Sequence, residues 1–140
     1  MSLNTPLKRL QELFDRIDIG NESNSQGQHS LEKSDQLASY IIWLDAEPMI
    51  PERTYTIKFE SESTNVQITD LAFKVDINSL NHLAAKKLEK DEVGYCKLSL
   101  GKKVSFDTYR NNQKLGSFNV YDSLNNVILG FGLVDFELRR

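Results

Sequence analysis

The sequence predicts an all-β domain, either an antiparallel sandwich or a barrel, that follows a short N-terminal helix. From residue 37 onward, short runs of β-branched and aromatic residues are separated by turn-forming residues at close spacing, which is typical of antiparallel sandwiches and barrels. Before residue 20, apolar residues recur at helical spacing instead. Since 140 residues give room for one domain, we divide the chain into a helix and polar linker over 1–34 and a barrel domain over 35–140.

The N-terminal helix is predicted to begin at Thr5-Pro6. Threonine caps helix N-termini, and proline at the first helical position gives up no hydrogen bond that the helix needs. Gly20 is the expected end. We expect the apolar face to pack against the chain's own barrel; docking in a groove of another protein and pairing with a second copy are the alternatives. The apolar positions are Leu7, Leu10, Phe14 and Ile17.

The segment from Asp18 to Ser34 is polar and has no aromatic residue. It offers little to bury, so we predict a flexible linker in which His29 is solvated.

Alternation of apolar and polar residues then marks the strands. The first run, 37–45, is apolar almost throughout and indicates a strand buried on both faces. The parity of alternation slips at Thr69-Asp70, which predicts a β-bulge, and 79–91 is the only interior segment with helical character. Gly130 and Gly132 indicate a sharp bend or a close approach of another backbone segment. The remaining predicted strands are 55–60, 66–77, 93–100, 103–106, 115–122 and 126–138, with a hairpin turn at 122–126.

Charge argues against a general nucleic-acid binder, because the net charge is −3. Residues 97–116 nevertheless contain five basic residues and one acidic residue, a local excess of +4. Lysines that protect a solvated strand edge explain this excess; a patch for RNA or for an acidic protein partner is the alternative. The basic residues are Lys97, Lys102, Lys103, Arg110 and Lys114, against Asp107.

No catalytic, metal or cofactor site is expected. Alternation places Cys96 on the inward face, where a cysteine packs as a small apolar residue. Cys96 and His82 supply at most two ligands, fewer than zinc needs. His82 follows a polar turn, which predicts a turn hydrogen bond or a partner contact at the surface. The carboxylate pairs Asp45/Glu47 and Asp91/Glu92 are predicted to be solvated loop residues.

Cysteine usage and hydropathy suggest a location. One cysteine cannot form an internal disulfide, which favours a reducing, cytoplasmic setting. No apolar run approaches the roughly 18–20 residues of a membrane span, and the N-terminus lacks the apolar region of a secretory signal.

Five stretches occur in this order: WLDAEPMIPERTY (43–55), KVDINSLNHLAAKKLEKDEVGYCKLSL (74–100), FDTYRNN (106–112), GSF (116–118) and GFG (130–132). Together they resemble the C-terminal domain of the large, GTP-binding subunit of bacterial sulfate adenylyltransferase. The family's domain is similar to the third domain of elongation factor Tu, so the resemblance, over roughly 37–134, implies a six-stranded antiparallel β-barrel. The GTPase and second-barrel motifs of the family do not occur in this sequence, so neither GTP hydrolysis nor adenylyl transfer is carried over.

The resemblance implies a non-catalytic protein-interaction domain with a protein partner, for which sulfate adenylyltransferase subunits are candidates. Asp76, Asn78, His82 and Lys86 belong to the most specific shared motif, and we expect them to contact the partner. The alternative is that this motif shapes a long loop over one end of the barrel. A second hypothesis is RNA binding, because the barrel also resembles a translation-factor domain that touches transfer RNA; Phe106 and Tyr109 interleave with the basic residues. Self-association through the helix is a further expectation, and an enzyme acting alone is the least favoured.

Overall fold

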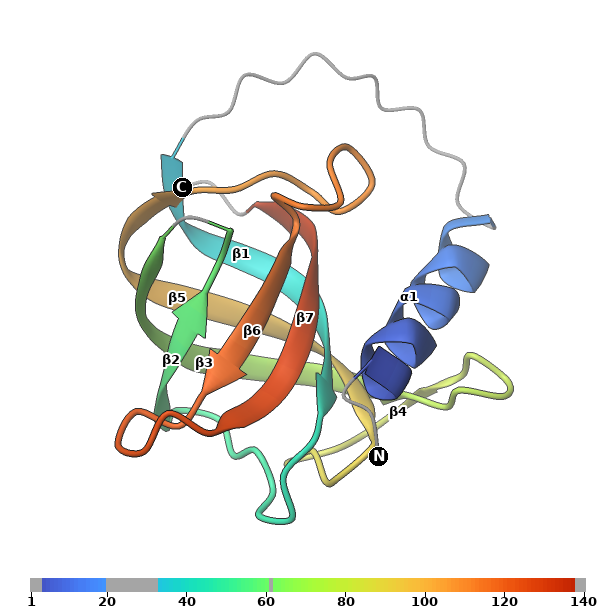
Figure 1. Cartoon of the computed structure of the whole chain (residues 1–140). Helices are drawn as coiled ribbons and strands as arrows, with labels where there is room; N and C mark the ends of the chain where they lie inside the picture. The colour runs from blue at the N-terminus through green and yellow to red at the C-terminus, as the bar shows by residue number, and fades with distance from the viewer. Residues whose placement is uncertain (1–3, 20–32, 61, 138–140) are drawn as a thin grey trace.

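The computed structural model describes residues 4–19, 33–60 and 62–137. It contains one helix and seven strands (Figure 1). The helix is α1 (Asn4–Ile19), and the strands are β1 (Lys33–Trp43), β2 (Thr54–Lys58), β3 (Ser63–Val75), β4 (His82–Leu83), β5 (Val93–Ser105), β6 (Ser117–Tyr121) and β7 (Ile128–Glu137).

Six of the strands form a closed antiparallel barrel. The order along the sheet is β2-β6-β7-β1-β5-β3, and β2 pairs back with β3 to close it. The two-residue strand β4 pairs with the end of β3 outside this ring. The prediction of a six-stranded antiparallel barrel with an added N-terminal helix is therefore confirmed.

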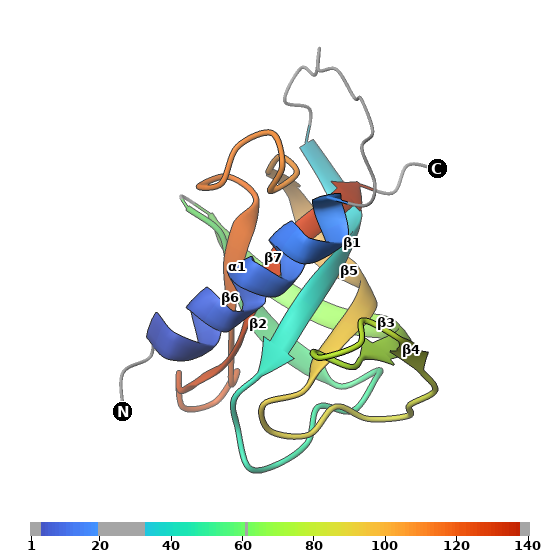
Figure 2. The same cartoon turned by 90° about the vertical axis from the view of Figure 1, so that its right-hand side faces the viewer.

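Strand β1 is buried on both faces, as its apolar sequence predicted. Leu37, Ile41 and Trp43 point into the barrel core, whereas Tyr40 and Ile42 belong to a second cluster beneath α1. Figure 2 shows α1 lying across the outer side of the barrel in front of β1 and β7. The expectation that the helix packs on its own barrel is confirmed.

Several predicted boundaries need correction. The helix begins at Asn4, one residue before Thr5, within the usual scatter of helix ends. Strand β1 begins at Lys33, inside the predicted linker, because it pairs with the end of β5 from that residue onward. Strand β5 is continuous over the two strands predicted in this region, since its pairing with β1 extends from Val93 to Ser105, whereas its pairing with β3 ends at Leu100. Gly20 and His29 lie outside the described residues.

The helical character predicted for 79–91 is wrong. Leu80 and Asp91 adopt left-handed backbone conformations, each with φ of 68°, and these interrupt any regular helix. Between them, His82 and Leu83 form β4, and Leu88 makes a two-way backbone bridge with Met49. The predicted bulge, by contrast, is confirmed by a register shift between Ile68 and Asp70 in the pairing of β3 with β5.

Gly130 and Gly132 mark two close approaches: the one at Gly130 is to backbone, as predicted, and the one at Gly132 is to a side chain. A Cβ on Gly132 would lie 2.1 Å from the nearest ring atom of Phe118, so the aromatic ring covers this glycine. A Cβ on Gly130 would lie 2.9 Å from the carbonyl oxygen of Ile42. Strand β7 therefore packs against neighbours where a larger residue has no room.

Candidate protein-interaction surface

The residues expected to contact a partner lie on or beside the long connection from β3 to β5, residues 76–92, which we call the end loop. Asp76 begins it. Its Oδ1 accepts hydrogen bonds from the backbone N–H groups of Asn78, at 2.9 Å, and Ser79, at 3.0 Å. These bonds, with that of Ser79 the larger influence, lower the pKa of the Asp76 carboxyl. Asp76 thus shapes the turn. This agrees with the alternative interpretation of the motif, in which it shapes a long loop over one end of the barrel.

Asn78 is exposed at the tip of this turn, and its backbone is held by the helix. The guanidinium of Arg16 donates to the carbonyl oxygens of Ile77, at 2.6 Å, and Asn78, at 3.0 Å. Ile17, one residue further along α1, packs in the same cluster as Ile77 and Leu80. The last turn of α1 therefore fixes the first turn of the end loop.

His82 is exposed on β4, where its backbone pairs with Val75. Its ring stacks on Phe73 with centroids 3.7 Å apart and planes 10° from parallel. Phe73 stacks in turn on Tyr95, at 5.2 Å and 7°. Aromatic stacking, rather than the predicted turn hydrogen bond, therefore positions the imidazole at the surface.

Lys86 is exposed in the second half of the end loop, and in the part of the chain that the structure describes it forms no ion pair. Its surroundings are fixed by the bridge of Leu88 to Met49 and by an ion pair of 2.8 Å between Lys74 and Glu92. Burial alone would raise the pKa of Glu92, but its hydrogen bonds from Lys74 and from the Glu89 N–H outweigh burial and lower it. Glu92 is therefore a structural residue, and the prediction that it is simply solvated is wrong.

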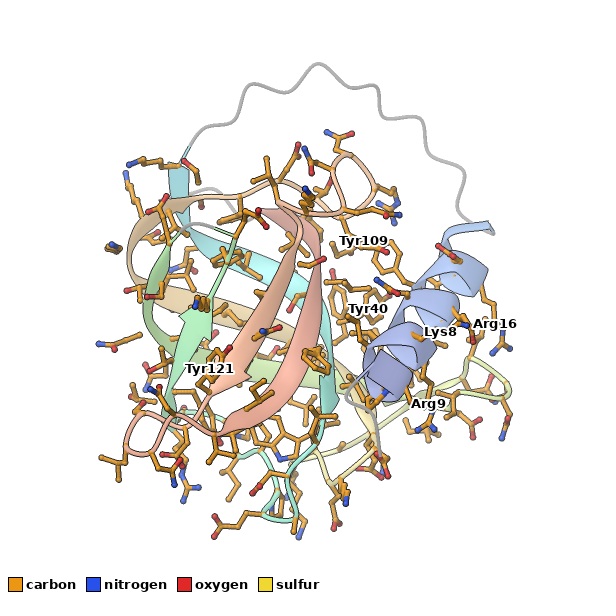
Figure 3. All side chains as sticks on the ribbon, viewed as in Figure 1. Lys8, Arg9, Arg16, Tyr40, Tyr109 and Tyr121 are labelled. Carbon is orange, nitrogen blue, oxygen red and sulfur yellow. The ribbon has the colours of Figure 1, made fainter. Side chains whose placement is uncertain are left out.

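A network on the outer wall, which the sequence analysis missed, joins the barrel to α1. The Tyr95 hydroxyl donates to Asp135 at 2.7 Å, and Arg110 pairs with the other oxygen of Asp135 at 3.4 Å. The Arg110 guanidinium also lies 5.3 Å from the ring centre of Phe14 on α1. Burial, followed by the charge of Asp135, raises the pKa of Tyr40 to about 12. Figure 3 shows Tyr40 and Tyr109 between the barrel and the helix.

The barrel interior holds no reactive thiol. Cys96 is fully buried in the core, as alternation predicted, and burial raises the pKa of its thiol further than the nearby charge of Asp70 does. Among the described residues, no group of three or more histidine, cysteine, aspartate or glutamate side chains could hold a metal ion. Helix α1 is neither long nor apolar enough to cross a membrane, and no other helix occurs in the described ranges.

Part of the basic segment 97–116 lies at a strand edge. Lys97 pairs with both β1 and β3, whereas Lys102 and Lys103 lie beyond Leu100, the last residue of β5 that pairs with β3. The explanation of the local charge by lysines at a strand edge therefore stays a prediction. The two aromatic residues of the segment are buried: Phe106 stacks on Phe59 in the core, and Tyr109 packs edge-on against Phe14. Neither ring is available to stack on a nucleotide base.

Comparisons with known proteins agree with this architecture. Residues 36–135 match the family described as GTP-eEF1A C-terminal domain-like. The bifunctional enzyme NodQ of Rhizobium meliloti is 41% identical over 107 residues, which are 76% of this chain and 17% of that protein. Sulfate adenylyltransferase subunit 1 of Pseudoalteromonas atlantica is 33% identical over 137 residues, or 93% of this chain and 28% of that protein.

A solved structure of sup35 complexed with GDP has the same fold, with a TM-score of 0.72 at 13% identity, over 87% of this chain and 31% of that one. The chain thus spans 17% to 31% of the length of these three proteins. The match to a sulfate adenylyltransferase subunit 1 confirms the resemblance to the large subunit of that enzyme. By its matched residues, its relatives and its barrel, the chain belongs to the GTP-eEF1A C-terminal domain-like family.

Proposed function

We propose that this protein is a non-catalytic interaction domain that contacts a protein partner through the end loop. The observation that supports this most is the anchoring of an exposed motif. Asn78, His82 and Lys86 face solvent, while the loop beneath them is held by Arg16, by the Met49–Leu88 bridge and by the Lys74–Glu92 ion pair. A loop that is already ordered loses little conformational entropy on binding, which favours affinity.

Sulfate-activation proteins are the partners that we propose. The curated relatives include a sulfate adenylyltransferase subunit 1 and the bifunctional NodQ, in which the matching part is a minor fraction of the chain. A barrel that forms part of a larger enzyme supports a role in assembly rather than in chemistry. The fully buried Cys96 and the structural contacts of Asp76 and Glu92 support the same interpretation.

The test is isothermal titration calorimetry, in which purified sulfate adenylyltransferase subunits are titrated with the full chain. We expect His82→Ala combined with Lys86→Glu to weaken binding at least tenfold. The matched control is Lys102→Ala combined with Lys103→Ala, two exposed lysines at the opposite end of β5, which should change affinity less than twofold. Urea denaturation of each variant separates lost contacts from lost stability.

Each result decides one part of the proposal. No binding by the native chain would exclude sulfate adenylyltransferase as the partner. Equal weakening by both double variants would exclude the end loop as the site. A large loss of stability in the His82 and Lys86 variant, with Lys86→Glu alone still binding normally, would favour a purely structural role for the motif.

RNA binding remains the second candidate because Lys97, Lys102 and Lys103 are exposed. Transfer RNA belongs in the same titration, at two salt concentrations. Phosphate contacts would make its affinity fall steeply with salt, and the lysine double variant would then lose binding while the end-loop variant kept it.

A further inference from the structure

The outer wall of the barrel carries an apolar face that α1 covers; we call this face the groove and define it by Tyr40, Ile42, Tyr109, Phe131 and Leu133. Helix α1 fills this groove with three buried side chains at the spacing i, i+3 and i+4. They are Leu10, Leu13 and Phe14, each at most 3% exposed. The Phe14 ring packs edge-to-face with Tyr40 and Tyr109, with centroids 5.8 Å and 5.2 Å apart.

The contacts between α1 and the barrel are made by side chains. Strand β1 lies under the helix, but its backbone is hydrogen-bonded to β5 and β7, so undocking α1 breaks no sheet hydrogen bond. An isolated helix of 16 residues is marginal in water, which makes the groove the main reason why this segment is helical. Docking of α1 is therefore a binding equilibrium within one chain.

The family match places the groove and the helix in different parts of the chain. Residues 36–135 include every groove residue and exclude α1. An exposed apolar wall of this kind needs a covering partner, since large uncovered apolar patches mark interaction sites. In this chain α1 covers the groove. Its buried side chains therefore indicate which kind of ligand the groove can bind.

We propose that the groove is a helix-binding site for a partner protein, with α1 as an internal occupant that the partner helix displaces. The seating of α1 defines the ligand: an amphipathic helix with two aliphatic residues and one aromatic residue at i, i+3 and i+4. A guanidinium two positions later matches Arg16, which reaches the carbonyl oxygens of Ile77 and Asn78. This surface differs from the exposed side chains of the end loop, so the inference does not rest on the function proposed above.

The test uses the full chain with Leu10→Asp and Leu13→Asp, which we call the undocked variant, and a fluorescent peptide with the sequence of residues 4–19. We expect the undocked variant to bind this peptide at least tenfold more tightly than the native chain, whose own helix competes at a high effective concentration. A peptide with the same two aspartates should not bind. Adding Ile42→Glu to the undocked variant should abolish binding of the native peptide.

Two outcomes would overturn the inference: a folded undocked variant that does not bind the peptide, or native and undocked chains that bind it equally. If the undocked variant fails to fold, Leu13→Ala takes its place, because it weakens docking without burying a charge, and the same comparison applies. His82→Ala with Lys86→Glu should leave peptide affinity within twofold. Failure at the groove and failure at the end loop are thus separate results.

Discussion

Ser39 is an exception inside an otherwise apolar barrel. The residue is fully buried, and its hydroxyl has no hydrogen-bond partner within the described structure. Burying an unsatisfied polar group costs about 1–3 kcal/mol. We therefore expect Ser39→Ala to raise the free energy of unfolding by about 1 kcal/mol in urea denaturation. Ser99→Ala is the control, because the Ser99 hydroxyl accepts a hydrogen bond from Gln36; if both variants lose stability, the Ser39 hydroxyl has a partner in solution.

Gly132 gives a second prediction at the scale of single residues. Its missing Cβ leaves room for the Phe118 ring, so Gly132→Ala forces that buried ring to move. We expect a loss of about 1–3 kcal/mol, as for other overpacked cores. Phe118→Leu should cost less in the Gly132→Ala background than in the native chain, and a double-mutant cycle measures this coupling. Additive losses would mean that the new methyl group meets something else.

Single residues also show how far alternation predicts structure. The inward position of the Cys96 side chain could be predicted, because it depends only on the alternation of residues within one strand. The stack of His82, Phe73 and Tyr95 could not, because it depends on which residues face each other across strands. Two register shifts in β3, at Ile68/Asp70 and Leu71/Phe73, place Phe73 opposite Tyr95. The first shift is visible in the sequence as a slip in the alternation of apolar and polar residues. The residues that it brings opposite each other across β3 and β5 are not visible there.

At the scale of elements, the docking of α1 was predictable and the path of the end loop was not. A strand that is apolar on both faces needs a second cover, and the amphipathic helix supplies it. The end loop turns at Leu80 and Asp91, and leucine gives no sequence signal for a left-handed backbone. Its leucine spacing therefore suggested a helix.

The link between α1 and the end loop predicts a local change in dynamics. Arg16→Ala removes two charge-assisted hydrogen bonds to the turn at Ile77 and Asn78. We expect amide hydrogen exchange at residues 78–80 to accelerate roughly tenfold, corresponding to about 1.4 kcal/mol. Arg9→Ala, an exposed position on the same helix, should change these rates less than twofold. Uniform acceleration throughout the barrel would contradict a local role for Arg16.

The turn at Asp76 predicts a pH dependence. Its pKa is lowered in the folded chain, so the stabilisation is complete above the unfolded value of about 3.9 and is lost as pH falls through the lower folded value. Asp76→Asn keeps an oxygen acceptor but cannot ionise. The free energy of unfolding of this variant should therefore fall less steeply between about pH 4 and pH 2, as followed by chemical denaturation. Parallel curves for variant and native chain would show that this carboxylate is not linked to folding.

At the scale of the whole molecule, the closed barrel leaves little exposed sheet edge. Strands β2 and β3 close the ring, and within the described ranges the strand outside it, β4, has two residues, while β5 extends past its last pairing with β3 by only a few residues. Long free edges invite pairing with other chains, so this topology protects the protein from aggregation. Alternation alone predicted a sandwich or a barrel equally well, because closure is a property of pairing between distant strands. The family resemblance, not the strand pattern, distinguished the two.

The pairing of β1 with β7 has a consequence for synthesis on the ribosome. Leu37 is paired with Glu137 and Trp43 with Gly130, so the first strand made must wait for the last before the barrel can close. During that interval Phe131 and Leu133 of the groove are not yet present, so the segment 4–19, which has already been translated, can cover only Tyr40, Ile42 and Tyr109. Nascent chains stalled before β7 emerges should be cleaved rapidly by protease, and chains with Leu10→Asp and Leu13→Asp should bind chaperones more strongly. The N-terminal segment would then protect the newly made chain from aggregation until the barrel closes.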